Sequence, residues 1–297
     1  MLPFKKIDIS DKKRYDEITR NINSMMCAHY FVDLFIWRVT YNTKICFEGD
    51  FVFIKQRLES ETVYTIPLGN GDLTQAIELL KQDAEERNVV FHLAAVNENQ
   101  KNLLEAISPG QYEFNEERDS EDYIYLAENL MTLAGKKLHS KRNFINRFVS
   151  TYENSWSYEN INEENLHEVF NFHLSWCALN ENEENRDFFG ETCAISLALK
   201  NFEELGLKGG LIRIDGQVIA FTLGFRASED LFIVNIEKAD HTIAGAYQMI
   251  NNQFAVHNFE GVKYVNREED LGKEGLRRAK LSYYPEMLGQ NFTAFLK

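Results

Sequence analysis

Two polar side chains end an otherwise apolar segment in the second half of the chain. The segment LFIVNIE spans residues 231–237. The alternation of side chains along a strand predicts Asn235 and Glu237 on one face and Phe232 and Val234 on the other. This polar pair at the end of a buried strand marks a candidate site.

A second apolar segment, VKYVN at residues 262–266, is predicted to lie parallel to the first. The helix expected between them forms a right-handed crossover, which brings Asn266 near Glu237. Ligands of open α/β sheets bind beside the carboxyl ends of such strands. The alternative is that Asn235 and Asn266 only satisfy each other or nearby backbone, because a buried amide must be hydrogen-bonded.

A dense mixture of charges follows the second segment. Carboxylates here are able to accept a proton from an attacking amine or hydroxyl, and cations are able to hold a carbonyl or a phosphate. The alternative is a solvated helix with ion pairs between successive turns. We predict no metal site, since adjacent acidic residues of one element cannot all face one ion. The side chains in question are Arg267, Glu268, Glu269, Asp270, Arg277, Arg278, Lys280 and Tyr283.

A positive segment stands out in a chain whose net charge is -14. Lys136, Lys137, Lys141 and Arg142 lie in a stretch that lacks acidic residues, and an apolar stripe follows it. We predict a basic helix over residues 136–152 whose cations bind the phosphates of a nucleic acid, a nucleotide or a lipid headgroup. The alternative is a helix that bridges two domains and pairs its cations with neighbouring acidic surfaces.

The elements that must position these residues occur twice in the same order. Each half is predicted to contain two helices, a hairpin, a third strand, a crossover helix and a buried strand parallel to the third one. The equal spacing of these elements indicates a duplication. One α+β domain with a coincidental order of elements is the alternative. The hairpins turn at Gly49–Asp50 and Asp215–Gly216, the crossover helices start near residues 73 and 243, and the buried strands are 89–96 and 262–266.

The overall composition limits the class of protein. The 297 residues are enough for two cores, and we predict an α/β protein with domains over residues 1–135 and 136–297. The sequence contains four cysteines without a CxxC pair, an N-terminus without an apolar h-region and no apolar run long enough to span a bilayer. We therefore expect a cytoplasmic protein without a transmembrane segment. Signatures of hydrolases, metalloproteases and nucleotide-binding loops do not occur.

Three strings carry a resemblance to a known family. GKKLHSKRNFINRF, NIEKADHTIAGAYQMINNQFA and YVNREEDLGKEGLRRAKLSYYP resemble the bacterial family that includes the C-terminal domain of phosphatidylglycerol lysyltransferases. The resemblance covers nearly the whole chain. It implies two tandem GNAT-like (N-acetyltransferase-like) domains, distantly similar to the Fem-type peptidyltransferases, each a mixed sheet flanked by helices. The phosphate-binding motif of acyl-CoA enzymes occurs only in distorted form at residues 241–246.

The resemblance implies an aminoacyltransferase that uses aminoacyl-tRNA as donor and a small or lipid-linked acceptor. No cofactor is certain. The alternatives are an acyl-CoA-dependent N-acyltransferase, with a coenzyme A groove between the two strands, and a non-catalytic binding protein. By this analogy the catalytic residues are Glu237, Asp270 and Lys280, the substrate-binding residues are Asn235, Asp240, Asn266, Arg267, Glu269 and Tyr283, and the tRNA contacts are Lys136, Lys137, Lys141 and Arg142.

Overall fold

The computed structural model describes residues 1–58, 60–180 and 188–297, which divide into two compact units. The first unit contains residues 1–122, 269–272 and 289–297, and the second contains residues 123–268 and 273–288. The first unit thus includes two C-terminal segments, and the second unit begins at residue 123. Within the described residues, none of the helices combines the length and apolar character that crossing a bilayer requires.

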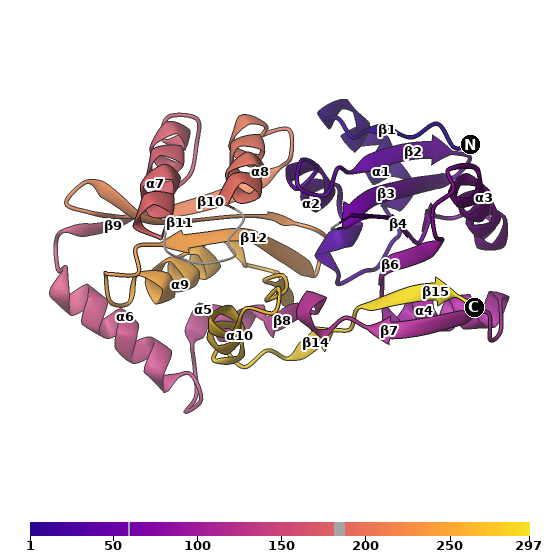
Figure 1. Ribbon diagram of the computed structural model, residues 1–297. Helices are drawn as coiled ribbons and strands as arrows, with labels where there is room; N and C mark the ends of the chain where they lie inside the picture. Colours follow the sequence, from indigo (N-terminus) through magenta and orange to yellow (C-terminus); the bar gives the residue numbers. More distant parts are fainter. Residues whose placement is uncertain (59, 181–187) are drawn as a thin grey trace. The chain divides into compact units, whose positions relative to one another are not determined.

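The first unit has an eight-stranded mixed sheet with the order β1-β2-β3-β4-β6-β15-β7, and β5 pairs with β3 (Figure 1). Its elements are β1 (Lys5–Lys6), η1 (Ile9–Asp11), α1 (Lys12–Thr19), η2 (Cys27–His29), α2 (Phe31–Ile36), β2 (Lys44–Glu48), β3 (Phe51–Leu58), β4 (Glu61–Thr65), β5 (Leu68–Gly69), α3 (Leu73–Glu86), β6 (His92–Val96), α4 (Glu98–Ile107), β7 (Tyr112–Glu116), η3 (Arg118–Ser120) and β15 (Phe292–Leu296).

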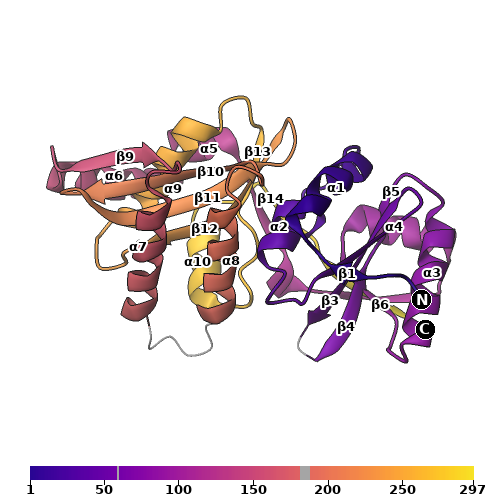
Figure 2. The same ribbon diagram turned by 90° about the horizontal axis from the view of Figure 1, so that it is seen from above.

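The second unit has a seven-stranded mixed sheet with the order β14-β8-β13-β12-β11-β10-β9. Helices α7 and α8 lie side by side on one face of it in both views, and α9 covers the other face (Figures 1 and 2). Its elements are β8 (Asp122–Leu126), α5 (Ala127–Thr132), α6 (His139–Thr151), β9 (Trp156–Asn160), α7 (Leu166–Leu179), α8 (Phe188–Lys200), β10 (Leu207–Ile214), β11 (Gln217–Arg226), β12 (Leu231–Ala239), α9 (Ala246–Asn258), β13 (Tyr264–Asn266), α10 (Glu274–Leu281) and β14 (Met287–Gly289).

The predicted repeat of elements is confirmed. Strands β2, β3 and β4 form an antiparallel meander, and helix α3 returns the chain to β6, which is parallel to β4. Strands β10, β11 and β12 with helix α9 and the parallel strand β13 repeat this path. Asp72 caps α3 through the backbone N–H groups of Thr74 and Gln75. Asp215 and Gly216 both have positive φ, as the predicted hairpin turn requires.

The last strand of each repeat is exchanged between the sheets. Strand β8 follows the elements of the first repeat but pairs with β13, whereas the C-terminal strand β15 pairs with β6 and β7. Figure 1 shows β15, in yellow, beside β7, in magenta. Each sheet is therefore completed by a strand that is distant in sequence.

Strand β12 contains a β-bulge. Leu223 of β11 pairs with Ile236, whereas the next residue, Gly224, pairs with Val234, so Asn235 is the extra residue of β12. A bulge bends its strand and redirects the side chains that follow it.

The bulge corrects the predicted distribution of side chains on this strand. Phe232 and Val234 pack with residues of α9, as does Ala239 beyond the bulge. Glu237 also faces α9, where it contacts Asn251. The expectation that Glu237 lies opposite Phe232 and Val234 is therefore wrong, because strict alternation assumes an unbroken pleat.

Candidate active site

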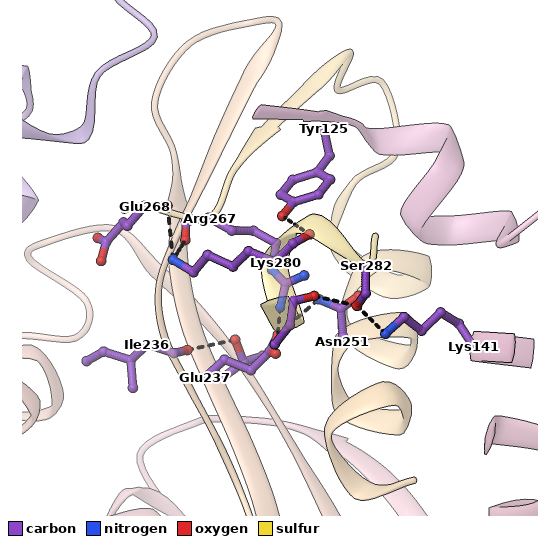
Figure 3. Close-up of polar contacts among 11 residues, drawn as sticks. Tyr125, Lys141, Ile236, Glu237, Asn251, Arg267, Glu268, Lys280 and Ser282 are labelled. Atoms are coloured by element: carbon purple, nitrogen blue, oxygen red, sulfur yellow. Dashed lines mark hydrogen bonds and ion pairs between the residues drawn. The ribbon is translucent and has the colours of Figure 1, made fainter. Parts of the chain in front are cut away.

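The site in the second unit is centred on an ion pair between Glu237 of β12 and Arg267, which directly follows β13. Arg267 Nη2 lies 2.8 Å from Glu237 Oε1, and the two side chains are only 11% and 13% exposed. Asn251 of α9 donates from Nδ2 to the other carboxylate oxygen at 3.0 Å. Figure 3 shows these side chains converging from a strand, a loop and a helix. Both carboxylate oxygens thus accept a hydrogen bond from the protein.

The position of this pair follows from how the two parallel strands pair. The ladder between β12 and β13 covers three residue pairs and ends at Ile233 opposite Asn266. Strand β12 continues for six residues beyond that point, to Ala239, and Glu237 lies on this extension. Such a place, beyond the carboxyl end of a parallel strand, is where α/β sheets bind ligands.

Two aromatic rings surround the Arg267 guanidinium. Its Cζ atom lies 4.9 Å from the centre of the Tyr283 ring and 5.5 Å from that of Tyr125. Burial is the largest single effect on the pKa of Arg267 and lowers it, but several opposing contributions, led by the charge of Glu237, together raise the pKa. Burial also raises the pKa of both tyrosines. The guanidinium is therefore a fixed cation in a site that contains neutral phenols.

Lys280 and Asn266 hold the loop that carries Arg267. Lys280 Nζ donates to the carbonyl oxygens of Arg267 at 2.5 Å and of Glu268 at 3.0 Å (Figure 3). Asn266 Oδ1 accepts from the Glu268 backbone N–H at 2.6 Å. Glu268 has a φ of 56°, a conformation that these contacts support. The geometry gives Lys280 and Asn266 a positioning role.

Asp240, Glu269 and Asp270 have contacts of their own. The carboxylate of Asp240 accepts from the backbone N–H and hydroxyl of Thr242, in the turn that leads to α9. Glu269 and Asp270 belong to the first unit. There Asp270 is fully buried, lies 3.6 Å from Arg118 Nη1 and accepts from the Gly272 N–H.

The predicted basic segment separates into exposed and buried cations. Lys136 and Lys137 are exposed and precede helix α6. Lys141 is 9% exposed, donates to Ser282 Oγ at 2.6 Å and lies 4.2 Å from the Tyr283 ring centre (Figure 3). Burial, then the charge of Arg267, lowers the pKa of Lys141. Arg142 donates to the backbone carbonyl oxygens of Leu133 and Gly135. Of the four predicted phosphate contacts, Lys136 and Lys137 are therefore the exposed ones, and Lys137 Nζ lies 5.4 Å from the Tyr284 ring centre.

The N-terminus of α9 packs against α6. Its N-cap, Gly245, has a φ of 92°, and a Cβ atom there would lie 2.8 Å from the Phe144 carbonyl oxygen and 3.2 Å from Phe148 Cβ. A carbonyl oxygen at this point repels an anion. The arrangement does not favour the binding of coenzyme A phosphates at this helix end, where the acyl-CoA alternative would require it.

Sequence reasoning missed Asn251, Tyr125 and Ser282. Asn251 lies on the apolar crossover helix, and its polarity among buried neighbours is the one signal that marks it. Tyr125 lies on β8, in the part of the chain assigned to the other domain, and donates from its hydroxyl to the Lys280 carbonyl oxygen. A strand exchange of this kind leaves no local trace in the sequence.

Comparisons with known proteins support the resemblance. A family described as phosphatidylglycerol lysyltransferase, C-terminal, matches residues 19–295. An uncharacterized protein of Mycoplasmoides gallisepticum is 28% identical over 170 residues, which are 57% of this chain and 54% of that protein, so the match spans about half of the relative. A solved protein of unknown function from Bacteroides thetaiotaomicron is 40% identical over the full length of both chains, with a TM-score of 0.94.

More distant structures share the fold. The structure of L-PGS from Bacillus licheniformis is 14% identical, with a TM-score of 0.68 over 100% of this chain and 94% of that one. FemX is 9% identical, with a TM-score of 0.63 over 100% of this chain and 98% of that one. The predicted tandem GNAT-like fold is confirmed.

Proposed function

Because the chain belongs to the family of phosphatidylglycerol lysyltransferase C-terminal domains, we propose that it is an aminoacyltransferase. It moves an aminoacyl group from aminoacyl-tRNA to a small or lipid-linked acceptor, in the cytoplasm where charged tRNA is available. The observation that supports this reaction is the Glu237–Arg267 pair beyond the end of the β12–β13 ladder. It combines a proton acceptor with a cation in a water-poor place.

The proposed reaction is direct transfer between two bound substrates. A hydroxyl or amine of the acceptor attacks the ester carbonyl carbon, and the bond from that carbon to the tRNA ribose oxygen breaks. Glu237 accepts the proton of the nucleophile and then donates it to the ribose oxygen as that oxygen leaves. Arg267 Nη1 donates to the oxyanion that forms on the carbonyl oxygen. Tyr283 and Lys280 hold this guanidinium in place through the contacts described above.

Glu237→Ala is expected to lower the transfer rate at least 100-fold, since it removes the proton acceptor and a partner of Arg267. The resemblance also implies a catalytic role for Asp270, so Asp270→Ala identifies which carboxylate is required. Single-turnover transfer from labelled aminoacyl-tRNA measures both rates. Unchanged rates in both variants would refute the assignment of the base.

The exposed lysines before α6 are the proposed contact for tRNA phosphates. Neutralising Lys136 and Lys137 together is expected to weaken tRNA binding. The slope of log Kd against the logarithm of the salt concentration should fall by about 1 to 2. The matched control neutralises Lys6 and Lys13, which are equally exposed in the first unit. Each variant is titrated with charged tRNA across a salt series, and wild type also with acetyl-coenzyme A. The proposal would be contradicted if the Lys136/Lys137 variant and the Lys6/Lys13 variant lost the same affinity for tRNA. It would also be contradicted if wild type bound acetyl-coenzyme A and not tRNA.

A further inference from the structure

A buried amide on helix α9 has a hydrogen-bond acceptor that the protein leaves unused. Asn251 is 4% exposed, and its Nδ2 donates to Glu237 Oε2. A carboxylate that is paired with Arg267 accepts hydrogen bonds, so this contact fixes the NH2 group toward Glu237 and the oxygen away from it. Among the described residues, Asn251 Oδ1 has no hydrogen-bond partner.

The bulge residue Asn235 repeats this arrangement. It is 8% exposed, and its Nδ2 donates to Glu268 Oε1 at 2.7 Å. Its Oδ1 atom is likewise buried without a partner in the described part of the chain. Asn235 and Glu237 both lie on β12, and Glu268 directly follows Arg267, so the two amide–carboxylate pairs share strand β12 and the Arg267–Glu268 loop.

An unused donor completes the set. Arg267 Nη1 is buried and has no acceptor among the residues that the structure describes, although Nη2 of the same group binds Glu237. Unsatisfied buried polar atoms are rare and costly, and three in one cluster call for a ligand or water. The cluster offers two amide oxygens beside two carboxylates, and one cationic donor.

We infer that Asn251 and Asn235 recognise the primary ammonium group of the aminoacyl donor. Arg267 Nη1 donates a hydrogen bond to the carbonyl oxygen of the same aminoacyl group. An ammonium group provides three donors and a positive charge, which the amide oxygens and the carboxylates of Glu237 and Glu268 match. The identification of the ligand as an aminoacyl group rests on the proposed function. An acyl group without an amine would leave both amide oxygens unpaired, and such a site rejects it strongly. Asn251 is therefore a specificity-determining residue.

Binding of small amides to the full chain tests this inference by calorimetry. Wild type is expected to bind L-alaninamide at least about 10-fold more tightly than N-acetyl-L-alaninamide or propionamide, which lack the ammonium group. Asn251→Leu should remove this preference and retain the helix. Gln253→Leu is the matched control, since it makes the same kind of change at a neighbouring position of α9 that is partly exposed. It should bind like wild type.

Equal binding of the three amides by wild type would overturn the inference and indicate that the cluster holds only water. This comparison needs no variant, so it remains decisive if Asn251→Leu does not fold. A preference that survives in a folded Asn251→Leu protein would also overturn it. Transfer from tRNA separates the two proposals. Ammonium recognition without transfer contradicts the proposed function alone, and equal transfer of aminoacyl and N-acetylaminoacyl groups contradicts this inference alone.

Discussion

Breaking the Glu237–Arg267 pair should destabilise the second unit far more than breaking a surface ion pair. Both side chains are nearly buried, so Glu237→Gln leaves the Arg267 charge without its carboxylate. Removal of one partner from a buried pair costs about 3 kcal/mol of unfolding free energy. Arg267→Met should cost a similar amount, because it leaves the Glu237 charge with Asn251 as its partner.

The double variant, Glu237→Gln with Arg267→Met, should cost less than the sum of the two changes. It leaves no uncompensated charge, so we expect a coupling free energy of about 2 kcal/mol. Urea unfolding followed by linear extrapolation measures all four proteins. The control is the exposed pair of Lys12 and Asp16, which are 26% and 48% exposed and whose coupling should be about 0.5 kcal/mol or less. Additive losses at Glu237 and Arg267, within about 0.5 kcal/mol, would refute the reasoning.

Three further predictions concern helix packing, pH and the loop of the site. Gly245→Ala should lower the unfolding free energy by about 1 to 3 kcal/mol, since φ is 92° and a Cβ atom would meet the Phe144 carbonyl oxygen. Thermal denaturation measures this loss, and an unchanged stability would contradict the close approach of the two helices. Burial lowers the pKa of His29 to about 4, below its unfolded value near 6.5, so its contribution to stability is present above pH 6.5 and is lost as the pH falls toward 4. In wild type the urea midpoint should fall as the pH is lowered from 6.5 toward 4, and this fall should be smaller in His29→Asn. An equal fall in both proteins would show that His29 does not cause it. Lys280→Met should lower the unfolding free energy by about 2 kcal/mol, because two carbonyl oxygens lose their hydrogen-bond donor. It should also slow transfer, since Arg267 is then held less firmly. If neither the stability nor the transfer rate falls, the loop is held in another way.

The local elements and their repetition are encoded in short stretches of the sequence. Turn residues at Asp215–Gly216, the cap at Asp72 and the helical spacing of α9 each act within a few residues, so pattern reasoning identifies them. The parallel pairing of β12 with β13 followed from the handedness of the crossover. These features predict that Asn266 lies near Glu237, and the family resemblance adds Arg267 to the same site.

The strands that complete each sheet and the polar groups that meet in the site depend on contacts between distant segments. The exchange of β8 and β15 depends on pairing between distant segments, which hydrophobic periodicity does not encode. The bulge at Asn235 depends on register with β11, and it reverses the face on which Glu237 projects. Lys141 is buried and Asn251 faces the site because of how α6 and α9 pack. Sequence patterns predict amphipathic elements, whereas register and packing between distant elements determine which of their polar atoms share a site.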